Sequence, residues 1–270
     1  MFVLVLGVLG LCWGSFLNVV IYRLPKLLLA ESQSIGHMTL FSPGSFCIFC
    51  HYPIAWFFKI PVISFLMLRG QAHCCKNKIP KKYIFVELLT GISMILVYQL
   101  FGVSLKAFAS LGLISVLFVL SYIDLETLLL PDNITLPALW LGLICNIFDT
   151  FTPLKNAVMG AAVGYILFFL IAYFFKKCQQ VEGLGQGDFK LFALLGAWLG
   201  YEALPSILLL ASLTGSALGL CLMIINRKFQ WRQQIPFGPF LAFGGIMCLL
   251  FPSKLGQFQA YLGISNLCLK

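Results

Sequence analysis

Acidic residues are scarce in this chain, and their positions suggest chemistry. Only nine Asp and Glu occur among 270 residues, and five of them fall in two stretches, 121–132 (SYIDLETLLLPD) and 181–190 (VEGLGQGDFK). Two carboxyl groups held close together cannot both ionise easily, so such a pair shares a proton. One member can then activate water while the other donates a proton to a carbonyl group. The pattern therefore suggests aspartic peptidase chemistry, with Asp124 and Asp188 as the candidate catalytic pair.

Most of these acidic residues also have an ordinary structural explanation. Asp188 precedes an apolar run and could be a helix N-cap, and the same role is our preferred one for Asp132. Glu126 and Glu182 could be solvated loop residues. Asp124 ends an apolar segment, where the helix dipole disfavours a negative charge. Capping therefore explains Asp124 poorly, which makes it the more informative member of the pair.

A second group of candidate ligands lies between residues 23 and 83. Cys47 and Cys50 have the spacing of two thiolate ligands for one structural zinc ion. The expected second pair is incomplete, because Ala72 stands where its first cysteine would be. Four neighbouring residues could complete the site, with Cys75 and Cys74 preferred and the histidines as competitors: Cys75, Cys74, His73 and His51. The alternative is a reduced loop without metal, and a closed four-ligand site would be structural rather than catalytic.

The elements that must position these residues are membrane spans. The chain is 60% hydrophobic and 10% charged, whereas soluble domains are about 25% charged. A span needs about 20 apolar residues, so we predict an all-α polytopic membrane protein with about eight transmembrane helices. The expected spans are 2–22, 84–102, 106–123, 133–149, 156–175, 189–201, 204–225 and 237–252. The sixth is short enough to be tilted or partly re-entrant.

Loop charge predicts the orientation. Of the 18 Lys and Arg residues, 14 fall in the loops that lie on one side of the membrane under this topology. Basic loops are cytosolic, so the N-terminus is expected outside, with the first span uncleaved. Both acidic stretches then lie at the cytosolic membrane face. The expected domains are the first span (1–22), a cytosolic loop domain (23–83), a peptidase bundle (84–252) and a C-terminal tail (253–270).

Other enzyme classes lack their signatures here. No His-Glu-x-x-His motif occurs, and all three histidines lie in the 23–83 loop, so neither a metalloprotease nor a Ser-His pair within the bundle is expected. The positive charge lies between apolar spans, which favours a topological role over nucleic-acid binding. A transporter or channel remains the alternative, since acidic residues at short helices also mark ion paths. Transport carboxylates tend to lie near the membrane midplane, whereas these lie at span ends.

Four motifs resemble those of the bacterial type IV prepilin peptidases, which are bifunctional leader peptidases and N-methyltransferases. The similar segments are 14–25 (GSFLNVVIYRLP), 123–132 (IDLETLLLPD), 183–200 (GLGQGDFKLFALLGAWLG) and 235–245 (IPFGPFLAFGG). The resemblance implies an inner-membrane aspartic endopeptidase with Asp124 and Asp188 as its catalytic pair. It further implies prepilin or pseudopilin precursors as substrates, cut at the cytosolic face. S-adenosylmethionine is implied as the donor that methylates the new N-terminus.

Such substrates have basic leaders, which gives the remaining acidic residues a role. Glu126 and Glu182 would form a local negative site in basic surroundings and dock the leader. Gly185 and Gly187 permit close approach of a backbone, so an extended peptide could lie against them; the alternative is that they only form a turn. The site for S-adenosylmethionine is not fixed by the sequence, and the region from Cys47 to Cys75 with residues near Asn18 and Arg23 is the candidate.

Overall fold

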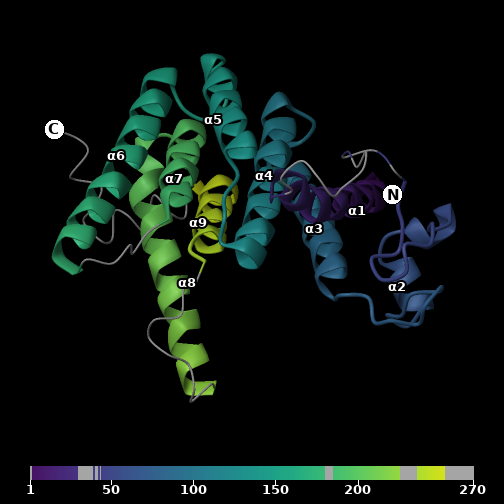
Figure 1. Ribbon diagram of the computed structural model, residues 1–270. Helices are drawn as coiled ribbons and strands as arrows, with labels where there is room; N and C mark the ends of the chain where they lie inside the picture. Colours follow the sequence, from purple (N-terminus) through teal and green to yellow (C-terminus); the bar gives the residue numbers. More distant parts are fainter. Residues whose placement is uncertain are drawn as a thin grey trace. The chain divides into compact units, whose positions relative to one another are not determined.

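The computed structural model describes residues 2–29, 39, 42, 44–179, 185–225 and 236–252, and these are helical with short connections (Figure 1). The chain forms two compact units, Met1–Val103 and Ser104–Lys270. Five helices are long and apolar enough to cross a membrane: Phe2–Leu27, Lys82–Phe101, Leu105–Thr127, Leu154–Cys178 and Tyr201–Ile225. The protein is therefore an all-α polytopic membrane protein, as predicted.

Two long helices, α1 (Phe2–Leu29) and α3 (Lys82–Phe101), lie against each other in the first unit. Their contact is close because small residues meet there: a Cβ atom added to Gly10 would lie 2.8 Å from the Cα atom of Gly91. Small residues let helix backbones approach closely in membranes. Asn18 reinforces the pair, since its Nδ2 donates to the carbonyl of Tyr83 at 3.0 Å.

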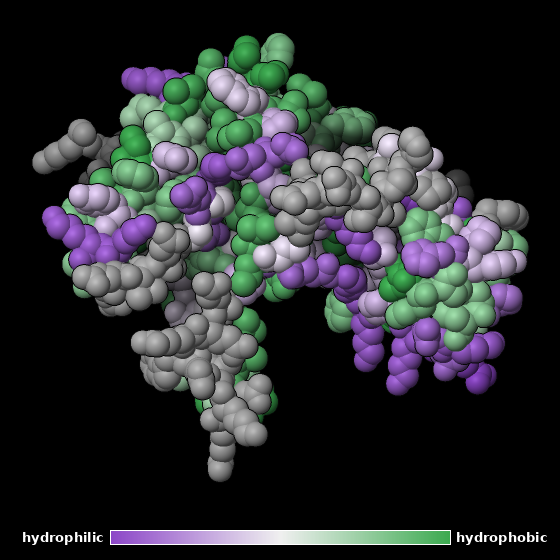
Figure 2. All heavy atoms as spheres, viewed as in Figure 1, coloured by the Kyte–Doolittle hydropathy of each residue, from purple (hydrophilic) through white to green (hydrophobic). Residues whose placement is uncertain are grey.

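The segment between α1 and α3 contains only short helices, η1 (Trp56–Lys59) and α2 (Ile63–Met67). Isolated bridges pair Phe46 with Pro53 and Gln71 with Lys78, and each closes a tight turn. The place of α2 in Figure 1 locates this segment in Figure 2. There it carries many hydrophilic residues at its outer edge. The described part of the predicted cysteine-bearing loop thus contains short helices and turns and belongs to the first unit.

The second unit contains the remaining helices, and α7 lies at its centre. Its elements are α4 (Leu105–Thr127), α5 (Asp132–Ile147), α6 (Leu154–Gln179), α7 (Gln186–Leu199), η2 (Tyr201–Ala203), α8 (Leu204–Ile225) and α9 (Gly238–Leu250). Helices α5, α6 and α9 all pack on α7, and nearly every α7 residue from Asp188 to Trp198 is buried. Helices α6 and α8 expose large apolar side chains, such as Ile166, Phe169, Leu220 and Ile224.

Three of the eight expected spans form helices that are shorter than the other five. Helix α5 has 16 residues, α7 has 14 and α9 has 13. At 1.5 Å per residue, α7 is about 21 Å long, which is less than the hydrocarbon core of about 30 Å. From Leu191 to Leu199 all its residues are apolar, as is typical of a helix that is enclosed by protein.

Side-chain hydrogen bonds and a glycine contact fix α7 at its C-terminal end. Asn146 donates to the carbonyls of Ala197 and Trp198 at 2.9 and 3.0 Å, and the indole nitrogen of Trp198 donates to the carbonyl of Ala138 at 2.8 Å. Gly196 of α7 packs directly against the backbone of Gly160 in α6, where no side chain would fit. These contacts fix the position of α7 in the second unit. They therefore also help to place Asp188, which lies near the N-terminal end of the helix.

Candidate active site

Asp124 lies in the last turn of α4 and is 5% exposed. Helix α4 ends where Leu128 adopts a left-handed conformation (φ 56°) and its N–H donates to the Asp124 carbonyl. A carboxylate is disfavoured at this end of a helix. The compensation comes from α9, because the Gly238 N–H donates to Asp124 Oδ2 at 3.0 Å. The positive end of α9 therefore faces the Asp124 carboxyl group.

Asp188 is the third residue of α7 and is 8% exposed. The N-cap is Gly185, so the alternative in which Asp188 is the N-cap is wrong. Its carboxyl group instead turns back and forms a hydrogen bond with the Gly185 backbone, as the third residue does in a capping box. The N-terminus of α7 thus faces the Asp188 carboxyl group, as the N-terminus of α9 faces that of Asp124.

The two aspartates interact electrostatically, although they are 64 positions apart in the chain. Asp188 lies outside the five candidate spans, and burial together with the Asp124 charge raises its pKa to about 7. Near neutral pH, one proton can therefore reside on the pair. Such a pair can remove a proton from water and donate one to a carbonyl oxygen.

The connection between α4 and α5 packs on the beginning of α7. A Cβ atom added to Gly187 would lie 2.7 Å from the Cβ atom of Leu130. Lys190 of α7 forms an ion pair with Asp132, at 2.6 and 2.7 Å to its two carboxylate oxygens. Asp132 is the first residue of α5 and Pro131 is the N-cap, so the expected capping role of Asp132 is wrong. These contacts bring the two acidic stretches together.

For the other acidic and glycine candidates, the structure gives the exposure of three residues and does not describe the fourth. Gly185 and Glu126 are exposed and Gly187 is half-buried, all near the two aspartates in sequence. Glu182 lies outside the described residues. Sequence reasoning missed Gly238, whose amide contacts Asp124. The available signal was the run Pro236-Phe237-Gly238-Pro239, since Pro favours the first turn of a helix and Gly permits close approach.

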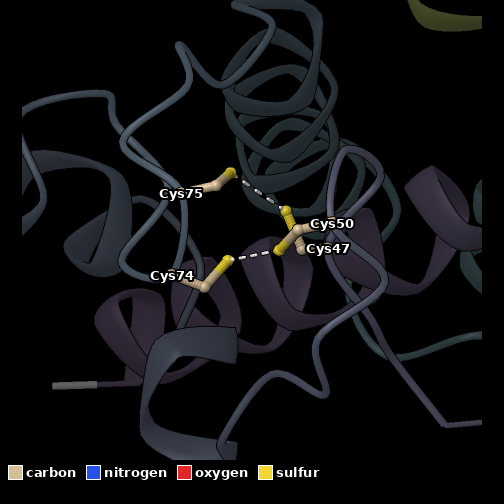
Figure 3. A group of neighbouring side chains, drawn as sticks. All are labelled: Cys47, Cys50, Cys74 and Cys75. Carbon is tan, nitrogen blue, oxygen red and sulfur yellow. Dashed lines mark hydrogen bonds between the residues drawn. The ribbon is translucent and has the colours of Figure 1, made fainter.

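The candidate metal ligands form a separate cluster in the first unit (Figure 3). The sulfur atoms of Cys47, Cys50, Cys74 and Cys75 all lie within 4.8 Å of one another. Cys50 is 3.1 Å from Cys74, and Cys47 is 3.7 Å from Cys75. His73 is not part of this group of four, and its ring centroid lies 4.7 Å from that of Phe58.

Two turns of the same backbone shape carry these four cysteines. In the first, the N–H of His51 donates to the Cys47 carbonyl at 2.9 Å, and in the second the N–H of Lys76 donates to the Ala72 carbonyl at 2.9 Å. The residues His51 and Lys76 have φ values of 57° and 58°. Ala72 therefore occupies the position of Cys47, and Cys75 that of Cys50.

Cys74, the middle residue of the second turn, provides the thiol that Ala72 lacks. The adjacent residues Cys74 and Cys75 therefore both reach the cluster from this one turn. Burial opposes ionisation of Cys47, but backbone hydrogen bonds from Cys50 and Phe49 lower its pKa to about 7. Hydrogen bonding to Cys50, followed by burial, raises the pKa of Cys74 to about 12. Four crowded thiols of this kind suit a soft cation with tetrahedral coordination, such as zinc.

Comparisons with known proteins match both units. Residues 8–101 match the model of the bacterial peptidase A24 N-terminal domain, and residues 111–220 match that of the type IV leader peptidase family. No solved structure matches.

Curated relatives cover almost the whole chain. A prepilin leader peptidase/N-methyltransferase of Dickeya chrysanthemi is 43% identical over 260 residues, which is 92% of each chain. Proteins with that name from Stutzerimonas stutzeri and Burkholderia pseudomallei strain 1026b are 43% and 41% identical. They align with 94% and 90% of this chain and with 92% and 84% of their own lengths. The chain, with its paired buried aspartates and its cluster of four thiols, therefore belongs to the type IV leader peptidase family.

Proposed function

We propose that this protein is a membrane aspartic endopeptidase that cleaves the basic leader of type IV prepilin-like precursors and then N-methylates the new N-terminus. The observation that carries the proposal is the pair of buried, interacting carboxylates, Asp124 and Asp188. They lie in a chain that aligns over most of its length with prepilin leader peptidase/N-methyltransferases.

The two aspartates would divide acid and base chemistry between them. Asp188, with its raised pKa, holds the shared proton and donates it to the carbonyl oxygen of the scissile bond. Asp124 takes a proton from water, which then attacks the carbonyl carbon. The N–H of Gly238 holds the Asp124 carboxyl group in one orientation during this step. No covalent intermediate with the enzyme is needed.

Substrate docking would use residues that lie near the two aspartates in the sequence. Gly185 leaves the beginning of α7 without side-chain bulk, so an extended peptide can approach Asp188, whereas the room beside Gly187 is taken by Leu130. Glu126 and Glu182 would attract the basic leader. Neutral Gln at both positions should then raise the KM for a precursor peptide and weaken its dependence on salt concentration. Unaltered KM and salt dependence would exclude this docking role.

The proposal includes the side of the membrane on which the precursor is cleaved and the methylation of the cleaved product. The loop charge favours cleavage at the cytosolic face of the bacterial inner membrane, with the N-terminus outside. S-adenosylmethionine would supply the methyl group. The substrates would be prepilins or pseudopilins. A transporter is not favoured, because Asp124 and Asp188 lie at helix ends and the relatives are named as peptidases.

Zinc would have a structural role in the first unit. Its ligands would be the four sulfur atoms of Cys47, Cys50, Cys74 and Cys75, and a closed site of this kind leaves no position for a reacting water. The ion would fasten the two turns to each other. Proteolysis by the aspartates would not require added metal.

Co-expression with a prepilin-like precursor, followed by mass measurement of the precursor's N-terminus, tests the proposal. Asp124→Asn and Asp188→Asn should each lower cleavage at least about 100-fold, the range expected for losing an acid or base. Asp149→Asn is the matched control, because Asp149 is exposed beyond the other end of α5 and its left-handed φ of 49° suits Asn. Near-normal cleavage by either active-site variant would refute the two-aspartate mechanism.

A further inference from the structure

The η1–α2 segment, residues 56–68, exposes an apolar surface in the loop that connects α1 and α3. Five of its large apolar side chains are exposed: Phe57, Ile60, Ile63, Leu66 and Met67. Met67 is 76% exposed, and no residue of α2 is buried. Single exposed apolar residues are ordinary, whereas a group of them in one short segment marks an interaction surface.

Helix α2 carries apolar side chains on both of its sides. Phe65 and Leu68 line a cavity of about 700 Å³, whose other walls include residues of α1 and α3. Ile63, Leu66 and Met67 are not among the residues that line it, and their spacing of three and four residues places them on one side of the helix. A surface helix in water normally has a polar outer side. The outer side of α2 therefore favours an apolar environment.

The depth of the segment follows from its contact with α3. The N–H of Val62, which directly precedes α2, donates to Glu87 Oε2 at 2.9 Å. The 20 residues of α3 span about 30 Å, which equals the hydrocarbon core, so its first residue, Lys82, marks the polar boundary. Glu87 lies five residues further on, about 8 Å inside that boundary. Val62 therefore lies near this level and not in bulk solvent.

Helix α1 gives a similar depth. Glu87 also forms a hydrogen bond with the side chain of Ser15, and a Cβ atom added to Gly14 would lie 2.7 Å from the Glu87 Cα atom. Arg23, the first basic residue of α1, is about 12 Å from Ser15 along the helix axis. Interfacial segments bury their apolar side about 5–10 Å into the boundary between headgroups and acyl chains. The η1–α2 segment lies at that depth.

Basic residues flank the apolar side chains. Lys59 ends η1, Arg69 follows α2 by two residues, and both are exposed. The sequence from 32 to 86 contains six Lys and Arg but no Asp or Glu. Figure 2 shows hydrophobic and hydrophilic residues side by side over this part of the chain. Long basic side chains can reach anionic headgroups while their stems lie on apolar surface.

We infer that the η1–α2 segment is a membrane-interface anchor. Ile63, Leu66 and Met67 enter the boundary of the acyl chains, and Lys59 and Arg69 bind anionic phospholipid headgroups. The partner is the bilayer that α1 and α3 themselves cross, so the exposed apolar surface of these spans continues onto the loop. The inference is independent of the proposed peptidase and methyl-transfer chemistry.

Photocrosslinking of the full chain in vesicles tests this inference. The photoreactive residue p-benzoylphenylalanine replaces Met67, and the protein is reconstituted with equal amounts of phosphatidylcholine and phosphatidylglycerol. Irradiation should give protein that carries one phospholipid, as detected by intact mass. The same probe in place of Phe169, which is 50% exposed on α6, is the positive control. In place of Asn77, exposed beside the second cysteine turn, it should give a lower yield of lipid adduct.

The headgroups found in the adducts test the basic flank. One Lys or Arg near a bilayer attracts anionic lipid by about fivefold. The adducts at position 67 should therefore contain several-fold more phosphatidylglycerol than phosphatidylcholine. Lys59→Gln combined with Arg69→Gln should bring this ratio close to one, whereas Lys155→Gln, a change in the second unit, should leave it unaltered. An unchanged ratio in the double variant would overturn the assignment of these two residues to headgroups.

Two other results would overturn the anchor itself. Crosslinked protein of twice the chain mass, without lipid adduct, would assign the apolar surface to a second copy of the chain. A lipid yield at position 67 no higher than at position 77, while position 169 is labelled, would place the segment in water. Leu66, which is 64% exposed on the same side of α2, provides a second probe position. Thermal unfolding at the wild-type temperature serves as the folding check for every variant.

Discussion

Gly238→Ala should inactivate the peptidase without unfolding it. A Cβ atom at this position would lie 2.6 Å from Asp124 Oδ2 and 3.2 Å from its carboxyl carbon. Ordinary van der Waals contact begins near 3.4 Å, so the carboxyl group must move by about 0.8 Å. A displacement of about 1 Å at a catalytic group can lower the rate about 100-fold. We expect a loss of cleavage of that order.

The stability change should have the opposite sign. Ala is favoured over Gly in a helix by up to about 1 kcal/mol, and Gly238 is the first residue of α9. The carboxyl group is the end of a side chain, so it can move without disturbing the helices. Thermal unfolding of the variant should therefore be unchanged or slightly raised, while kcat for precursor cleavage falls.

A cleavage assay on purified protein, with initial rates measured across precursor concentrations, provides the readout. Gly112→Ala is the matched control, because Gly112 belongs to α4, the helix of Asp124, and a Cβ atom there would meet nothing within 4 Å. It should cleave at the wild-type rate. Normal cleavage by Gly238→Ala would refute the claim that this amide positions the Asp124 carboxyl group.

Three other predictions concern the pH profile, the thiol cluster and the helix contact. The kcat/KM for cleavage should fall as pH rises through about 7, since Asp188 then loses its proton, and should fall again in acid as the pair becomes fully protonated. Elemental analysis should find zinc lost in Cys74→Ser, whereas Cys74→Ala combined with Ala72→Cys should retain it because position 72 is equivalent to position 47. Gly196→Val should destabilise the second unit by about 1–3 kcal/mol in thermal unfolding, because the added atoms meet the backbone of Gly160.

Each of these predictions has a contrary result that would overturn it. A profile without an inflection near pH 7 would contradict the raised pKa of Asp188. Full metal content in Cys74→Ser would exclude Cys74 as a ligand. An unchanged unfolding temperature in Gly196→Val would mean that α6 and α7 do not approach as closely as Gly160 and Gly196 indicate.

The sequence predicted the helices and the meeting of the two acidic stretches well. Long apolar runs determine helices in a membrane, because backbone polar groups must be satisfied within the segment. Span length was less predictable for α5, α7 and α9. Apolar composition is the same whether a helix faces lipid or is enclosed by protein, so the burial of α7 could be seen only in the packing.

Two features of the sites depend on tertiary structure and could not be derived from spacing. Gly238 reaches Asp124 across 114 positions in the chain, and no local pattern encodes such a contact. The role of Cys74 depends on the matching backbone of two turns, with left-handed residues at His51 and Lys76. In the sequence, Ala72 shows only that the second pair of cysteines lacks its first member.

The matching turns also suggest how such a site can change over generations without losing its function. A cysteine could first arise at position 74, beside an existing one at position 72, and give a turn with one ligand to spare. The cysteine at position 72 could then drift to alanine while the remaining four sulfur atoms stay together. The shape of the turn, rather than the spacing of its cysteines, is what selection would preserve.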